Sequence, residues 1–319
     1  MVIVAVVGPT ATGKSDLALD LAQRLSGNVP AEIVNSDAYQ MYRQMDIGTA
    51  KVPIAQRRGI VHHQVDVLEV SQDASVADFQ TRARADLAAI AQRGARAVVV
   101  GGSGLYVRAL LDHMDFPGTD PLVRAALERE CEELGVGHVF AQLEAKDPVA
   151  ARNIGSQNAR RIIRALEVIE LTGQPYSANL PRQEYVAPAV QIGLDCDREF
   201  LDAQVANRVD LMFEQGLVQE VTALAQQGLG RTAERAVGYA EILSHLRGEI
   251  TLDQARADIT ANTRRLARKQ MGWFGRDPRV QWLNAQDPDR IEKALAIVAR
   301  ADSGETLGGI EMVRRPLGS

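Results

Sequence analysis

The sequence contains few cysteines and no long apolar run. Among its 319 residues no stretch reaches the roughly 18 apolar residues of a membrane-spanning helix. The apolar run at 2–7 is short and continues directly into a glycine-rich loop, which does not fit a secretory signal, so we expect a cytoplasmic protein without membrane association. Cys131 and Cys196 lie far apart and outside any Cys-x-x-Cys or Cys/His cluster. They are therefore expected to be reduced thiols and neither a disulfide nor zinc ligands.

Lysine is also scarce, with five in the whole chain. Two of them, Lys14 and Lys51, lie in glycine-containing polar loops, which favours a chemical role for each. The net charge of −5 does not suggest a nucleic-acid partner, but the arginines are unevenly placed, and local basic patches are what bind phosphate. With 46% hydrophobic and 24% charged residues, the chain is long enough for about two domains, each with its own core.

Residues 8–15 match the phosphate-loop pattern G-x-x-x-x-G-K-[ST] in full. An apolar run precedes them, and a helical pattern follows with Leu17, Leu21 and Leu25 on one face, so the order is strand, loop, helix. Such a loop wraps a phosphate with backbone N–H groups at a helix N-terminus, where the helix dipole favours negative charge. The loop consists of Gly8, Pro9, Thr10, Ala11, Thr12, Gly13, Lys14 and Ser15. Lys14 adds a cation and Ser15 a hydroxyl ligand for Mg²⁺, although the pattern does not say which phosphate compound is bound.

Two further strands are predicted to end in polar turns beside this loop. Asp37 follows a strand at 31–37 and is a candidate general base, a Mg²⁺ ligand, or a turn or helix-capping aspartate. The apolar run at 95–100 breaks into Gly-Gly-Ser-Gly, whose glycines would let the backbone approach a ligand closely. Ser103 in this turn is either a ligand-contacting hydroxyl or only a helix N-cap. His62 and His63 are adjacent, so on a strand they face opposite ways, and we interpret them as loop or packing residues.

The order of elements predicts an α/β fold, a P-loop NTPase-like parallel sheet flanked by helices, with an all-helical insertion. Residues 1–116 and 189–300 would form the discontinuous core, because 117–188 contains only helical patterns before a strand at 189–195. A long helix at 199–225 with a break at Gly216 and another at 251–274 follow. Residues 301–319 are expected to form a flexible tail.

Arginines gather within the helical insertion. Arg160 and Arg164 are spaced i, i+4, and Arg161 and Arg164 are spaced i, i+3, so they lie on neighbouring positions of one helix. Contact with a phosphate backbone is one interpretation. A solvated helix face paired with Glu167 is the other.

Several segments together resemble the bacterial tRNA dimethylallyltransferases, in order and spacing, from about residue 3 to residue 285. The most specific are Asp-Ile-Gly-Thr-Ala-Lys at 46–51 and Gly-Gly-Ser-Gly-Leu-Tyr at 101–106. The others are the loop at 8–15, Asn-Ser-Asp-Ala-Tyr-Gln-Met-Tyr at 35–42, Arg-Ala-Leu-Glu-Val at 164–168, Arg-Ala-Val-Gly-Tyr at 235–239 and Thr-Arg-Arg-Leu-Ala-Arg-Lys-Gln at 263–270. The resemblance implies a prenyltransferase that moves a dimethylallyl group from its diphosphate to N6 of the adenosine 3′ of the tRNA anticodon and releases pyrophosphate.

The resemblance also implies roles for individual residues. Asp37 would be the general base, and Ser103 would orient the substrate. Lys14, Arg235 and a Mg²⁺ ion held by Ser15 would neutralise the pyrophosphate. The anticodon loop of the tRNA would contact Asp37, Ala38, Tyr39, Gln40, Ser103, Arg124, Arg160, Arg161 and Arg164. We expect a monomer with two substrates, tRNA and dimethylallyl diphosphate.

The chain departs from the family pattern at two places. Ala38 follows Asp37 where the family usually has serine, and Ile-Gly-Ser-Gln-Asn at 154–158 replaces a His-x-x-Asp-like run, which includes Gln157. Three other classes of protein share part of this pattern. A P-loop kinase would need a Walker-B aspartate after the strand at 95–100, adenylate isopentenyltransferase chemistry would not need an arginine-bearing insertion, and a non-catalytic RNA-binding nucleotide switch would not need a base-positioned Asp37.

Overall fold

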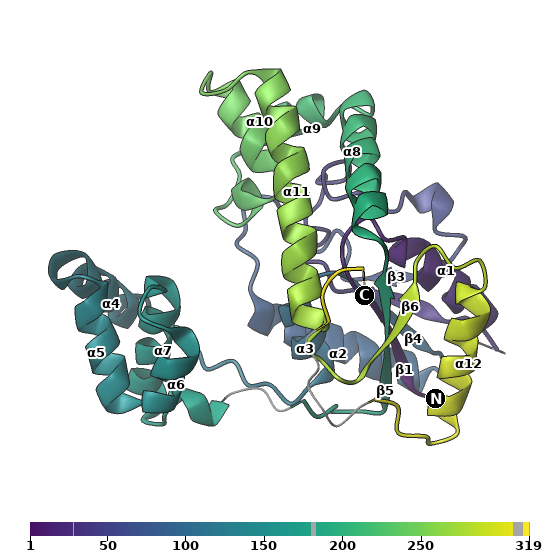
Figure 1. Cartoon of the computed structure of the whole chain (residues 1–319), viewed down its shortest axis with the longest axis horizontal. Coiled ribbons are helices and arrows are strands. Elements are labelled where there is room, and N and C mark those ends of the chain that lie inside the picture. The colour runs from purple at the N-terminus through teal and green to yellow at the C-terminus, as the bar shows by residue number, and fades with distance from the viewer. Residues whose placement is uncertain (28, 180–182, 309–314, 319) are drawn as a thin grey trace. The chain divides into compact units, whose positions relative to one another are not determined.

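The computed structural model describes residues 1–27, 29–179, 183–308 and 315–318 (Figure 1). Its contacts divide the chain into two compact units. Unit 1 combines Met1–Leu111 with Tyr185–Ser319, and unit 2 is Asp112–Glu184. The first division lies five residues before the boundary expected at 116/117, and the second lies four residues before that expected at 188/189. In the described part of the chain, no helix is long and apolar enough to span a membrane.

Unit 1 is built on a six-stranded sheet in which every strand pairing is parallel, in the order β3-β2-β4-β1-β5-β6. The strands are β1 (Ile3–Val7), β2 (Glu32–Asn35), β3 (His62–His63), β4 (Ala97–Val100), β5 (Ala189–Asp195) and β6 (Val280–Asn284). Because the strands are parallel, the turns after β1, β2 and β4 meet at one edge. There the Ser36 N–H donates to the Val100 carbonyl over 2.8 Å, and the Gly101 N–H donates to the Val6 carbonyl over 3.2 Å.

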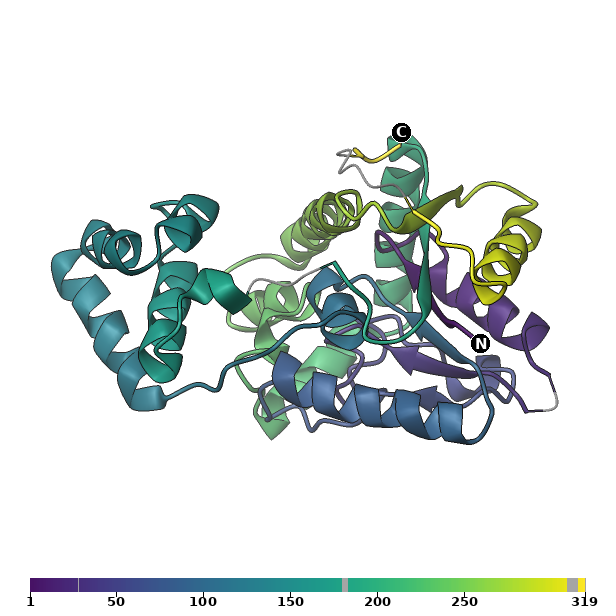
Figure 2. The same cartoon turned by 90° about the horizontal axis from the view of Figure 1, so that it is seen from below.

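Helices cover both faces of the sheet (Figure 2). Alternate residues of β1 point to opposite sides, so Val4 and Val6 pack with α1 (Lys14–Arg24) and α12 (Arg290–Asp302), and Val7 packs with α2 (Val76–Gln92) and α3 (Gly104–Leu111). Burial on both faces explains why the strands read as continuous apolar runs. The predicted α/β fold is confirmed.

The second half of unit 1 is mostly helical. It contains α8 (Arg198–Glu214), α9 (Leu217–Gln227), η3 (Ala233–Arg235), α10 (Tyr239–Leu246) and α11 (Leu252–Phe274). The predicted break at Gly216 is confirmed, since this residue has a φ of +98°, a left-handed conformation that glycine adopts without strain, and it begins α9. The chain then pairs β6 with β5 and ends the fold in α12.

Unit 2 contains α4 (Pro121–Leu134), α5 (Val136–Lys146), α6 (Pro148–Ile154), α7 (Ala159–Thr172) and η2 (Tyr176–Asn179), with no strand in its described residues. Side-chain oxygens of Asp120 and Asn158 accept backbone N–H groups at the starts of α4 and α7, as N-caps do. The helices share a core of their own around Val139, Leu143 and Ile162. The insertion is therefore all-helical, as predicted.

The end of the chain differs from the expected flexible tail. α12 continues to Asp302, and the expected tail begins inside this helix. Beyond the gap in the description at 309–314, the Arg315 N–H donates to the Gly275 carbonyl over 2.9 Å. The Gly318 N–H donates to a buried Asp195 carboxylate over 3.0 Å, and Leu317 packs beside Cys196. Residues 315–318 are held because Asp195, at the end of β5, accepts the Gly318 N–H and pairs with the Arg315 side chain.

Candidate active site

The loop at 8–15 has the geometry that its sequence predicts. Gly8 has a φ of +130°, and a Cβ at this position would lie 2.5 Å from the Leu194 carbonyl oxygen, so no other residue fits. Gly13 has a φ of +80° and begins α1. Inside the loop, the Thr12 hydroxyl donates to the Pro9 carbonyl over 2.9 Å. The loop is thus shaped by its own residues before any ligand binds.

Lys14 lies within reach of two other charged side chains. Its ammonium donates to the Pro9 carbonyl. Burial, together with the nearby Arg208 guanidinium, lowers the pKa of Lys14 to about 7, although the Asp37 carboxylate acts in the opposite direction. The structure therefore brings Lys14 and Asp37 together, as the sequence predicted, and adds Arg208. A pair of cations beside one loop is prepared for an anion that carries more than one negative charge.

Asp37 is positioned by the residue two places before it. The Asn35 amide oxygen accepts the Asp37 N–H over 2.9 Å, and the Asn35 amide nitrogen donates to the Asp37 carbonyl over 2.9 Å. One carboxylate oxygen of Asp37 accepts the Tyr39 N–H over 2.9 Å. These bonds fix the backbone on both sides of Asp37, so its partly exposed carboxylate holds one orientation.

The glycines of the turn after β4 lie close to protein atoms, and their predicted close approach to a ligand stays a prediction. A Cβ on Gly101 would lie 2.2 Å from the Ser36 hydroxyl, and one on Gly102 would lie 2.3 Å from the Gln270 amide nitrogen. The other amide atom of Gln270, its oxygen, accepts the Thr10 N–H over 2.8 Å. Gln270 on α11 thus joins this turn to the phosphate loop. Ser103 is partly exposed in the turn, and its hydroxyl has no hydrogen bond among the described residues.

Arg235 is exposed at the end of η3. Burial and the charge of Asp37 raise the pKa of Tyr39, and the positive charge of Arg235 opposes them. Arg235 and Asp37 are therefore both close enough to Tyr39 to act on it by charge. Three of the four predicted catalytic residues, Lys14, Asp37 and Arg235, are thus close enough to affect one another or Tyr39 by charge. The fourth, Ser103, lies on the neighbouring turn.

Arg208 on α8 is the site residue that the sequence analysis missed. It is partly exposed, and burial of its guanidinium lowers its pKa while Asp37 opposes that effect. Its neighbours on the helix, Val205 and Val209, are fully buried. An arginine next to the apolar positions 205 and 209 of a helix was the available signal, because a charge placed there usually faces a partner.

The segment after Asp37 is fastened to the rest of unit 1. Ala38 and Tyr39 pack against the core, and the Gln40 amide nitrogen donates to the carbonyls of Thr49 (3.0 Å) and Ala50 (3.4 Å). Gln40 also lines a small pocket that includes Ser15. The Gln40 N–H groups are therefore engaged within the protein, which leaves its amide oxygen for an outside partner.

Ser15 fits a magnesium ion that arrives with a phosphate. Its side chain is partly exposed at the start of α1, and its hydroxyl has no hydrogen bond among the described residues. Those residues also contain no group of three or more His, Cys, Asp or Glu side chains that could hold a metal by themselves. Mg²⁺ usually keeps several waters and binds through few protein ligands together with substrate phosphates. The donor set suits such an ion and not an all-protein cage.

The arginines predicted to bind RNA divide into two pairs in unit 2. Arg124 and Arg164 both form ion pairs with the buried carboxylate of Glu167, and Arg164 also donates to the Gly118 carbonyl over 3.1 Å. Arg160 and Arg161 are exposed and form no ion pair with a described residue. The expected pairing with Glu167 is therefore confirmed for Arg164, and phosphate contact by Arg160 and Arg161 stays a prediction.

The comparisons with known proteins agree along the whole chain. Residues 40–277 match the family model described as IPP transferase. The chain is 54% identical to the tRNA dimethylallyltransferase of Thermobifida fusca (93% of this chain, 94% of the relative) and 52% identical to that of Bifidobacterium animalis subsp. lactis (95% and 88%).

Solved structures give the same result. The tRNA isopentenylpyrophosphate transferase of Bacillus halodurans is 36% identical, with a TM-score of 0.69 over 95% of this chain and 97% of its own. A eukaryotic dimethylallyltransferase acting on tRNA, 24% identical, superposes with a TM-score of 0.83 over 98% of this chain and 82% of its own, which supports the fold. The motifs, the assembled site and these similarities together show that the chain belongs to the IPP transferase family.

Proposed function

We propose that this protein transfers the dimethylallyl group of dimethylallyl diphosphate to N6 of the adenosine 3′ of the tRNA anticodon and releases pyrophosphate. The observation that carries the proposal is the meeting of Lys14 and Asp37 at one edge of the sheet, with Arg208 and Arg235 beside them. The site offers cations for a departing anion and one oriented carboxylate for a proton. Family membership supplies the substrate class.

The transfer breaks the bond between the allylic carbon and the diphosphate oxygen and forms a bond between that carbon and N6. The electron pair of the broken bond leaves with pyrophosphate, beside the N–H groups of the 8–15 loop, Lys14 and Arg208. Arg235, whose positive charge acts on the neighbouring Tyr39, adds to the positive charge of the site. A Mg²⁺ ion at Ser15, when bound, supplies further positive charge to the diphosphate.

The adenine amino group loses a proton as it attacks, and Asp37 accepts it. A general base of this kind contributes about 10²- to 10⁴-fold in rate. Asn35 holds the Asp37 backbone through two hydrogen bonds, so the carboxylate is already oriented when the amine arrives. Ser103, on the turn beside the loop, has a hydroxyl available to orient the substrate. The target adenosine must leave the stack of its loop to reach this edge.

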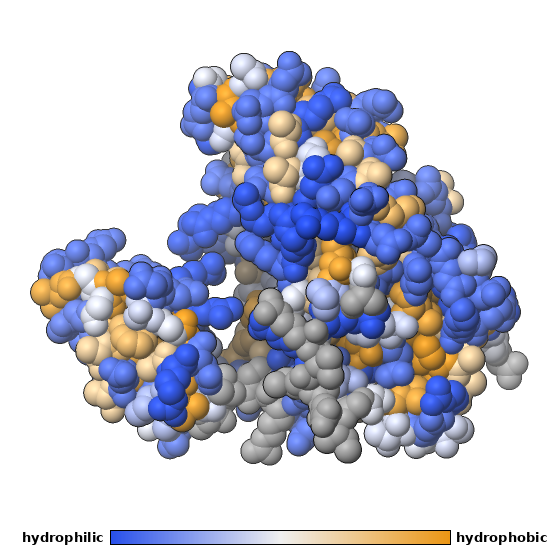
Figure 3. All heavy atoms as spheres, viewed as in Figure 1, coloured by the Kyte–Doolittle hydropathy of each residue, from blue (hydrophilic) through white to orange (hydrophobic). Residues whose placement is uncertain are grey.

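The tRNA would contact both units. In unit 2, Arg160 and Arg161 are exposed and available for phosphates, and Arg124 and Arg164 shape the surface through Glu167. In unit 1, strongly hydrophilic side chains gather over α11 (Figure 3). The exposed cations of that helix are Arg256, Arg265, Arg268 and Lys269, and Arg256 is paired with Asp210. Phosphate contacts of this kind position an RNA loop whose bases are read elsewhere. We further propose that the protein acts as a cytoplasmic monomer.

A mass assay tests the proposal directly. The protein is incubated with dimethylallyl diphosphate, Mg²⁺ and unmodified tRNA, the tRNA is digested, and the nucleosides are measured by mass spectrometry. We expect a gain of one dimethylallyl group on one adenosine and an equal amount of pyrophosphate. A parallel reaction contains a free adenine nucleotide in place of tRNA. If the nucleotide gains the dimethylallyl group and the tRNA does not, the RNA acceptor is refuted. If neither acceptor gains it, the activity is refuted.

A further inference from the structure

Glu220 on α9 binds an unusual number of donors from one distant loop. Its Oε2 accepts the backbone N–H groups of Asp46 (3.0 Å) and Ile47 (2.8 Å), and its Oε1 accepts that of Gly48 (3.2 Å). The hydroxyl of Tyr239 donates to the same Oε1. Three consecutive N–H groups around one carboxylate form a compact anion site, and charge-assisted bonds of this type are stronger than neutral ones.

The contact is sterically tight as well as polar. Tyr239 is fully buried, and a Cβ at Gly48 would lie 2.4 Å from its ring, so only glycine lets the loop approach. On the other side of the loop, the buried Lys51 ammonium donates to the carboxylates of Asp46 (2.8 Å) and Asp66 (2.5 Å). Lys51 therefore stabilises this loop through two ion pairs, whereas its position in the sequence favours a chemical role.

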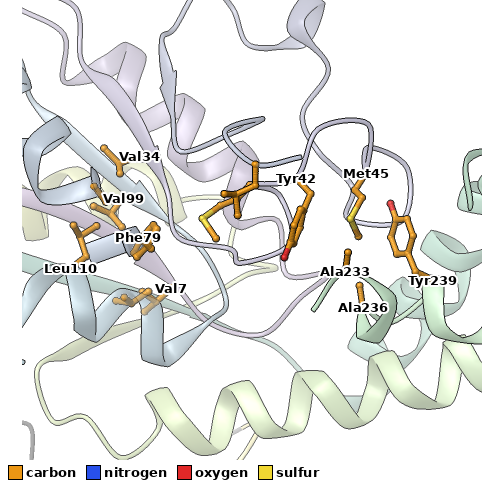
Figure 4. Packing of buried hydrophobic residues seen from close by; sticks show 14 of the residues in the cluster. Val7, Val34, Tyr42, Met45, Phe79, Val99, Leu110, Ala233, Ala236 and Tyr239 are labelled. Atoms are coloured by element: carbon orange, nitrogen blue, oxygen red, sulfur yellow. The ribbon is translucent and has the colours of Figure 1, made fainter. Parts of the chain in front are cut away.

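The loop that Glu220 binds follows Asp37 closely in the sequence, and Tyr239 follows Arg235 closely. Tyr42 and Met45 pack with Ala233, Ala236 and Tyr239 in one buried cluster (Figure 4). Asp37 is only five residues before Tyr42 in the sequence. Arg235 lies between two residues of the cluster, Ala233 and Ala236. The Glu220 carboxylate is thus the polar junction between the segment of the base and the segment of the cation.

From this junction we propose that Glu220 is a positioning residue, which sets the location of Arg235 relative to Asp37. The inference rests on the proposed function, in which Asp37 acts at the forming bond to nitrogen and Arg235 at the departing pyrophosphate. Both groups must be placed around one substrate, and a misplacement of about 1 Å can cost about 10²-fold in rate. Glu220 touches neither substrate in this proposal and acts only through the loop and Tyr239.

The Glu220→Gln variant tests the proposal, because the amide nitrogen would face N–H or O–H donors and one half of the junction would be lost. We expect kcat for tRNA modification to fall about 10- to 100-fold, with little change in KM for dimethylallyl diphosphate, because positioning matters most in the transition state. The decisive measurement is a double-mutant cycle with Arg235→Ala. If Glu220 acts through Arg235, the double variant will be about as slow as Arg235→Ala alone.

Independent losses that multiply in the double variant would overturn the positioning role. Glu214→Gln is the matched control, since this glutamate is exposed near the end of α8 and loses the same charge; its kcat should equal that of the unchanged protein. If Glu220→Gln fails to fold, as judged by circular dichroism, Tyr239→Phe removes one donor and must show the same coupling to Arg235→Ala. An unchanged protein that modifies no tRNA would refute the proposed function itself, and an active protein with multiplying losses refutes only this inference.

Discussion

The pKa of Lys14, about 7 in the ligand-free site, makes diphosphate binding depend on pH. An ammonium beside a bound diphosphate is stabilised in its charged form, so the pKa of Lys14 must rise when the ligand binds. Binding therefore takes up a proton wherever the free site has lost one. The perturbation is simply to raise the pH of the binding buffer, with no change to the protein.

The size of the effect follows from the fraction of free protein that is charged. With a pKa of about 7, this fraction is roughly one half at pH 7 and about 1% at pH 9, so the apparent Kd should rise about 50-fold across that interval. Proton uptake at pH 8 should be about 0.9 per diphosphate. The ligand contributes little in this range, because the last ionisation of a phosphate ester lies near pH 6.

Titration calorimetry with dimethylallyl diphosphate, in two buffers of different ionisation enthalpy, measures both quantities. Lys14→Arg is the control, because its guanidinium stays charged throughout the range, and its Kd should not vary with pH even if its affinity is lower. A constant Kd from pH 7 to 9 in the unchanged protein, with no proton uptake, would refute the lowered pKa or the contact of Lys14 with the diphosphate.

Four further predictions follow from the site and from unit 2. Asp37→Asn should retain substrate binding and lower turnover by about 10² or more, and near-normal turnover would remove Asp37 from catalysis. Arg160→Ala with Arg161→Ala should weaken tRNA binding and reduce the slope of log affinity against log salt by about one to two, whereas an unchanged slope would return both to a solvated face. Burial raises the pKa of Glu167, but hydrogen bonds from Arg164 and Arg124 lower it overall. Its contribution to stability is therefore present above the ordinary pKa of 4.5 and is lost as the pH falls below that value. Glu167→Gln should accordingly lower the free energy of unfolding by about 2 kcal/mol at neutral pH, measured by urea unfolding. The difference from the unchanged protein should shrink in acid, and a difference that does not change with pH would contradict this. Finally, ATP should be neither required nor hydrolysed during transfer, because breaking the bond to pyrophosphate already drives it; stoichiometric ADP or AMP would favour the kinase alternative.

Much of the fold could be predicted because the determining signals are local. The strand, glycine loop and helix at 3–24 depend on apolar periodicity and on two glycines with positive φ, and each of these is visible within a few residues of sequence. The break at Gly216 and the helical insertion follow from the same kind of signal. Family motifs then indicated Asp37, Ser103 and Arg235 as candidate site residues, although motifs alone do not show what holds them.

Tertiary structure decided which polar groups meet. Gln270 reaches the Thr10 N–H across 260 residues, and Glu220 reaches Asp46 across 174. It also decided that Arg124 and Arg164 pair with Glu167 while Arg160 and Arg161 remain exposed, a division that helical spacing could not make. The physical reason is that periodicity records which face of an element is buried, whereas a carboxylate or an amide can pair with any donor that the completed fold brings within about 3 Å. Most elements and the family are therefore readable from the amino-acid sequence, although the short strand at His62–His63 is not, and the partners of the charged groups depend on the completed fold.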